Sequence, residues 1–158
     1  MRILRNQSRT GKRRRGAVAV EAGLVLPMIF LFLFGIFEYG RYVMTLQVMT
    51  NAAREGAHYA LTHTQPVTIA GTTYGNATSD VTTIINKSLA GQSLVSQSVQ
   101  IYCSDSLGTN IGLWTDTQVG QSVCVRITGN FRVLMASLLG LPTNIPVVAQ
   151  SVMRSESN

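Results

Sequence analysis

The sequence predicts an α+β fold in which a long N-terminal transmembrane and stalk helix carries a small C-terminal head containing antiparallel β-structure. Three observations predict it: a basic segment at 1–16, an unbroken apolar run at 17–37, and short stretches of alternating apolar residues within 62–158. Mean hydropathy is +0.21 and charged residues are 13% of the chain, about half of the usual share in soluble domains. We therefore expect part of the chain to be associated with a membrane.

The positive charge of the chain is concentrated at its N-terminus. Residues 1–16 contain seven of the 13 Lys and Arg residues and no acid, whereas the rest contains six cations and seven acids. A net charge of +6 would by itself favour a nucleic-acid partner. A short basic arm without interleaved aromatic residues, directly before an apolar run, is better explained as a topology signal. We expect no nucleic-acid partner, a cytoplasmic leader at 1–16 and an extracytoplasmic C-terminal part.

The apolar run is long enough to cross a bilayer once. Ala17–Phe37 contains a single ionisable residue, Glu21, and as a helix it spans about 31 Å, which matches the hydrocarbon core. No small-x-small cleavage site follows the run, as a standard secretory signal requires. The run is therefore predicted to stay in the mature protein as a single transmembrane helix.

Two features inside this run are unusual for a membrane span. A carboxylate such as Glu21 costs about 2.5–3.5 kcal/mol at the bilayer centre. One alternative is a tolerated acid near the cytoplasmic boundary; the other is neutralisation by the α-ammonium of Ala17, on the same or a neighbouring subunit, if the chain is cut after Gly16. Pro27 removes the hydrogen bond to the carbonyl of Gly23, which predicts a kink or local melting there.

The helical pattern continues beyond the apolar run to about Leu61. We call its apolar and small-residue stripe the packing seam, whose members are Tyr39, Tyr42, Leu46, Met49, Ala53, Gly56 and Ala60. The heptad spacing and the shrinking side chains predict that 38–61, the extracytoplasmic part of the helix, packs closely against partner helices. Glu38 and Arg41 are expected to pair on the outer face at the membrane boundary, and Pro66 is expected to stop the pattern.

Residues 62–158 predict a small α+β head. The expected elements are a hairpin over 67–74, a short helix capped by Asp80 and closed by Gly91, a loop over 104–121 that holds Trp114, and strands over 98–103, 122–133 and 146–153. Pro146 places the last strand at a sheet edge.

The head offers little catalytic chemistry. Cys103 and Cys124 lie on predicted adjacent strands outside the cytoplasm, so a disulfide is expected, although two reduced core cysteines remain the alternative. No histidine follows His63, at the end of the stalk, which excludes a Ser/His triad built from the residues after it. No phosphate-binding loop or metal-ligand spacing is present, so we expect no enzymatic activity, no cofactor and no metal.

The N-terminal third resembles a known family. Arg13-Arg14-Arg15-Gly16 followed by Ala17-Val18-Ala19-Val20-Glu21 is similar to a type IV prepilin cleavage site, with a basic leader, a glycine before the cut and a glutamate at the fifth mature position. Three further features accompany this string: Pro27, Phe37-Glu38-x-Gly40-Arg41 and Ala52-Ala53-Arg54-Glu55-Gly56-Ala57. Together they resemble the TadE-like family of pseudopilins, or minor pilins, of the tight adherence (Tad/Flp) pilus. Ala22 departs from the family's usual aromatic, and also separates the chain from the short major pilins.

The resemblance implies a pilin-like fold and a non-catalytic role in pilus assembly and adhesion. It implies cleavage by a prepilin peptidase between Gly16 and Ala17, register setting by Glu21, and contacts with other pilins and the assembly platform of the bacterial inner membrane. The protein would sit in that membrane, or be incorporated into an extracellular pilus. The alternative is an uncleaved, membrane-anchored extracytoplasmic binding or scaffold protein, in which Glu21 is incidental.

Overall fold

The computed structural model describes residues 11–63, 67–69, 72–74, 77–89, 91–92, 94–105 and 107–156. Most of the basic leader, Pro66 and the turn of the hairpin predicted at 67–74 lie outside the described residues. The elements in chain order are α1 (Gly11–Thr62), β1 (Val67–Ile69), β2 (Thr72–Tyr74), α2 (Thr78–Ser88), β3 (Leu94–Ser104), β4 (Asn110–Gly112), a 3₁₀ turn η1 (Trp114–Asp116), β5 (Ser122–Arg132), α3 (Ala136–Leu139) and β6 (Asn144–Arg154). This confirms the predicted α+β, pilin-like fold.

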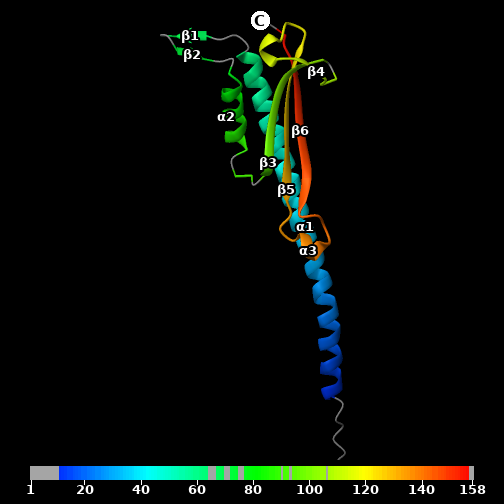
Figure 1. Cartoon of the computed structure of the whole chain (residues 1–158). Coiled ribbons are helices and arrows are strands. Elements are labelled where there is room, and N and C mark those ends of the chain that lie inside the picture. The colour runs from blue at the N-terminus through cyan, green and yellow to red at the C-terminus, as the bar shows by residue number, and fades with distance from the viewer. Residues whose placement is uncertain are drawn as a thin grey trace, which may run out of the picture.

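Helix α1 forms the backbone of the molecule. Its 52 residues span about 78 Å at the standard rise. The N-terminal half projects from the head, and the C-terminal half lies along the sheet (Figure 1). The helix continues through Pro27 without interruption, so local melting at this residue is absent, while a bend there stays a prediction.

The head is built on one antiparallel sheet with the strand order β4-β3-β5-β6. Strand β5 is central and pairs over its whole length with β6, from Ser122↔Arg154 to Arg132↔Asn144. The position of β6 at the sheet edge confirms the prediction from its proline. The predicted hairpin is confirmed as β1 and β2, which pair with each other outside the main sheet.

Strand β3 begins four residues earlier than the alternation pattern predicts. Its register with β5 shifts between Val95 and Ser98, and Ser96 has a φ of 54°. This is a β-bulge, which interrupts the two-residue period of the side chains. The pattern therefore becomes visible only from Ser98 onward.

The core lies between the sheet and the C-terminal half of α1, with α2 packed beside them. Every member of the packing seam from Met49 onward is buried; these are Met49, Ala53, Gly56 and Ala60. A Cβ on Gly56 would lie 2.6 Å from Cδ1 of Ile85 in α2, which shows how closely the two helices approach. The prediction that the seam packs on partner helices is therefore wrong for this part of α1: it packs on the chain's own sheet and α2.

Two local predictions in the head need correction. Helix α2 begins at Thr78 after an Ala77 cap, so Asp80 lies in the first turn and is not the capping residue. A carboxylate there still interacts favourably with the helix dipole. The loop predicted over 104–121 contains β4 and η1, and its Trp114 is 2% exposed with its indole N–H donating to Thr78 Oγ1 at 3.1 Å.

The predicted disulfide is also wrong, because both cysteines are buried and free. Across β3 and β5, Cys103 pairs with Val123, whereas Cys124 pairs with Tyr102. Paired residues share a face and neighbours along a strand alternate, so the two thiols point to opposite faces of the sheet. The Cys103 thiol instead donates a hydrogen bond to Gln121 Oε1, with an Sγ–Oε1 distance of 3.5 Å.

Candidate functional site

The first candidate site is the part of α1 that no described residue buries, which we call the apolar rod (residues 16–33). Every one of these residues is exposed; Val20, for example, is 76% exposed and Leu24 is 72% exposed. Among the described residues, one helix is long and apolar enough to cross a membrane, and its most apolar window has a mean hydropathy of 2.4 and no buried residue. This arrangement is consistent with anchoring in a membrane.

The residues of the predicted cleavage and register site lie at the start of this rod. Gly16, Ala17 and Glu21 are all helical and exposed. Ala17 and Glu21 are four residues apart, so they lie on the same face of α1, one turn from each other. No ion pair joins Glu21 to any side chain that the structure describes.

The second candidate site is the junction where the rod meets the head. Arg41 Nη1 donates to Glu38 Oε1 at 2.9 Å, and the backbone N–H of Leu134, which follows β5, donates to the same oxygen at 3.1 Å. The predicted pair between Glu38 and Arg41 is confirmed, but its predicted place on the outer face is wrong, because the Glu38 side chain is only 6% exposed. The carboxylate fixes α1 to a segment 96 residues later in the chain.

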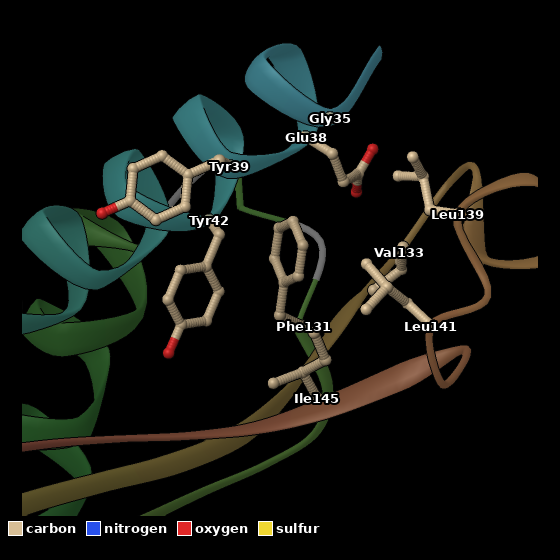
Figure 2. Close-up of a pocket in the computed structure, with 9 residues that line it drawn as sticks. All are labelled: Gly35, Glu38, Tyr39, Tyr42, Phe131, Val133, Leu139, Leu141 and Ile145. Carbon is tan, nitrogen blue, oxygen red and sulfur yellow. The ribbon is translucent and has the colours of Figure 1, made fainter. Parts of the chain in front are cut away.

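A cavity of about 380 Å³ lies at this junction (Figure 2). The Glu38 carboxylate points toward the space between Phe131 and Leu139 (Figure 2). Arg41 stacks over the Phe131 ring at 5.2 Å, and the Tyr42 ring meets the same ring edge-on at 5.6 Å. The full lining is Gly35, Glu38, Tyr39, Tyr42, Phe131, Val133, Leu139, Leu141 and Ile145.

Tyr39 and Tyr42 behave differently although both were assigned to the packing seam. Tyr42 packs against the core, whereas Tyr39 is 69% exposed. The sequence missed the contributions of Phe131, Leu134 and Leu139, which come from the far end of the chain. The Phe37-Glu38-x-Gly40-Arg41 motif was the only signal for this site, and it did not reveal that Glu38 is buried.

The outer face of the sheet carries a small polar cluster. Tyr102 donates to the carbonyl of Gly108 at 3.2 Å, and a hydrogen bond with the Cys124 side chain raises the pKa of its phenol. Asp105 accepts the backbone N–H groups of Thr109 and Leu107, each at 2.9 Å. These bonds, chiefly that from Thr109, lower the pKa of the Asp105 carboxyl.

These hydrogen bonds hold the turn that follows β3. Within the part of the chain that the structure describes, no group of three or more His, Cys, Asp or Glu side chains is placed to hold a metal ion.

Comparison with known proteins agrees with the sequence resemblance. Residues 16–58 match the model of the TadE-like protein family, so this part of the chain is similar to that family. The matched segment contains the apolar rod and most of the packing seam. No curated protein and no solved structure matches the chain. TadE-like proteins are associated with Tad pili and are generally non-catalytic.

Proposed function

We propose that the chain is a pseudopilin, or minor pilin, of a Tad-type pilus, cut by a prepilin peptidase between Gly16 and Ala17. Residues 17–37 anchor it in the inner membrane, with 1–16 in the cytoplasm and the head outside. The observation that supports this most is the apolar rod, which is exposed on every side beside a head with its own closed core. A rod of this kind needs lipid or other apolar helices around it.

The same rod fits both environments that the proposal requires. Lipid chains and apolar helix faces are similarly apolar, so exchanging one for the other changes little hydrophobic free energy. An assembly platform could therefore move the rod from the bilayer into a helical bundle of other pilins without unfolding the head. The head keeps its internal contacts with 38–61 throughout.

Glu21 provides the register in this proposal. Cleavage after Gly16 creates an α-ammonium on Ala17, one helical turn from Glu21. Inside an apolar bundle an unpaired carboxylate is strongly disfavoured, so the two groups pair within one subunit or between neighbours. The pairing favours one axial stagger of the helices over the others.

The test is the N-terminal residue and intact mass of the membrane-extracted protein, produced with and without its prepilin peptidase. We expect a start at Ala17 only when the peptidase is present. Gly16→Leu is expected to block the cut, while Gly40→Leu serves as the matched control; a Cβ meets no atom within 4 Å at either glycine. An uncut start under both conditions would refute the pseudopilin pathway and leave an uncleaved, membrane-anchored binding or scaffold protein.

A further inference from the structure

One buried oxygen at the junction has no hydrogen-bond partner among the residues that the structure describes. Glu38 Oε1 accepts two hydrogen bonds, one from the Arg41 guanidinium and one from the backbone N–H of Leu134. Glu38 Oε2 is buried and accepts no hydrogen bond from the described residues. Buried polar atoms in folded proteins nearly always have a partner, either a protein group or an ordered water, so this oxygen has the capacity to accept a further hydrogen bond.

The space beside Glu38 is an elongated apolar trough. The cavity of about 380 Å³ shares Gly35, Tyr39 and Leu139 with a second hollow of about 310 Å³. Together they follow α1 from Leu31 to Tyr42, a length of about 17 Å at the helical rise. The trough therefore runs along α1, with its charged group in the half nearer the head.

The trough lies where the apolar run ends. If 17–37 crosses the bilayer as proposed above, Glu38 is at the hydrocarbon boundary on the side of the head. Tyr39 and Tyr42 then lie at the depth where aromatic residues are enriched. The upper end of the trough is at the level of lipid headgroups, and its lower end at Leu31 and Phe32 is at the level of acyl chains.

We infer that this trough binds an aminophospholipid, with the primary ammonium pairing with the Glu38 carboxylate and an acyl chain along the lower trough. This rests on the proposed membrane anchoring. The lipid phosphate can reach Arg41, whose guanidinium has five donors and whose side chain is 32% exposed. The ammonium and phosphate of the lipid thus complement the carboxylate and guanidinium of the protein. A choline headgroup has no N–H to donate.

A second copy of the chain fits the trough less well. Its apolar run, 17–37, contains no basic side chain, so it brings no side-chain cation to Glu38. After cleavage the α-ammonium of Ala17 is the one cation of this run, but it lies about 32 Å from Glu38 along the helix, and Arg41 of the second copy is already paired with that copy's own Glu38. For a neighbour at the same depth, this separation places the ammonium in the opposite leaflet.

The experiment uses the full chain in vesicles containing equal amounts of phosphatidylethanolamine and phosphatidylcholine. Vesicle flotation first shows insertion, and native mass spectrometry after extraction identifies retained lipid. We expect about tenfold enrichment of phosphatidylethanolamine, in line with a charge-assisted hydrogen bond. Glu38→Gln is expected to abolish the enrichment, because an amide NH₂ replaces the accepting oxygen. Glu55→Gln, an exposed site higher on α1, is expected to keep it.

A second variant fills the trough without touching Glu38. A Cβ on Gly35 meets no atom within 4 Å, so Gly35→Leu is expected to fold and to lose both lipids. Fluorescence of the buried Trp114 confirms the fold of every variant.

The outcomes separate this inference from the proposed function. Equal retention of the two lipids by the wild type, or unchanged enrichment in Glu38→Gln, overturns the inference while flotation upholds the anchoring. If Glu38→Gln loses a complex between copies while the retained lipid is unchanged, the trough binds a second copy. That outcome also overturns the inference. Failure of the wild type to float refutes the anchoring, and the lipid site with it.

Discussion

Replacing Gly56 by alanine tests the close contact between α1 and α2. Gly56 is buried on the face of α1 that meets α2 and β5. The added Cβ would lie 2.6 Å from both Cγ1 and Cδ1 of Ile85 and 3.7 Å from Cγ1 of Val125. Carbon atoms pack favourably at about 3.5–4.0 Å, so α2 or the Ile85 side chain has to move by about 1 Å.

Two opposing terms determine the size of the effect. Forcing an extra methyl group into a packed core costs about 1–3 kcal/mol, and Ile85 is fully buried, which limits its relaxation. Alanine is favoured over glycine inside a helix by about 1 kcal/mol. We therefore expect Gly56→Ala to lower the free energy of unfolding by up to about 2 kcal/mol, the packing cost less the helix-propensity gain.

The assay is urea unfolding of the full chain in detergent micelles, followed by Trp114 fluorescence. Gly40→Ala is the control on the same helix, where a Cβ meets no atom within 4 Å; it is expected to raise the free energy of unfolding by up to about 1 kcal/mol. Adding Ile85→Val to Gly56→Ala removes Cδ1 and is expected to cost less than the sum of the two single changes. If Gly56→Ala is as stable as Gly40→Ala, or the double mutant is additive, the close approach of the helices is refuted.

Three further predictions concern the register residue, a turn and the cysteines. Glu21→Gln is expected to be cleaved and inserted normally but to reduce, at least several-fold, the amount of the chain in the sheared filament fraction; wild-type recovery would contradict the pairing role. Asp105 has a lowered pKa, so its stabilising contribution is complete above the ordinary value of about 3.9 and is lost as the pH falls through the lowered value. The stability difference between wild type and Asp105→Asn is thus expected to shrink on acidification, and a pH-independent difference would contradict this. Cys103 and Cys124 are expected to react with a thiol reagent only after unfolding, and a urea midpoint that falls on adding reductant would show that they are joined.

Much of the fold could be predicted from local patterns. The apolar run at 17–37, the continuation of the helix to about Leu61, and the strands at 98–103 and 122–133 all follow from side-chain periodicity. The edge position of β6 follows from Pro146, which cannot donate to a neighbouring strand. Each of these features depends on residues close together in the sequence.

The errors arose where distant segments meet. The periodicity of 38–61 shows which residues share a face, but gives no information about the surface that covers them, and the chain's own sheet covers most of that face. The disulfide prediction placed Cys103 and Cys124 on adjacent strands without the register. Pairing Cys103 with Val123 rather than Cys124 puts the thiols on opposite faces.

The sequence by itself determined that this chain has a membrane-length apolar helix, a segment at 13–21 that resembles a prepilin cleavage site, and a small β-containing head. These properties are set by composition and spacing within about one helix or one strand. The tertiary structure decided that Glu38 is buried, that Phe131 and Leu139 complete a trough beside it, and that the Ile85 side chain packs closely against Gly56. Each of these depends on contacts between residues 29 to 101 positions apart, and such contacts are fixed only when the sheet packs on the helix.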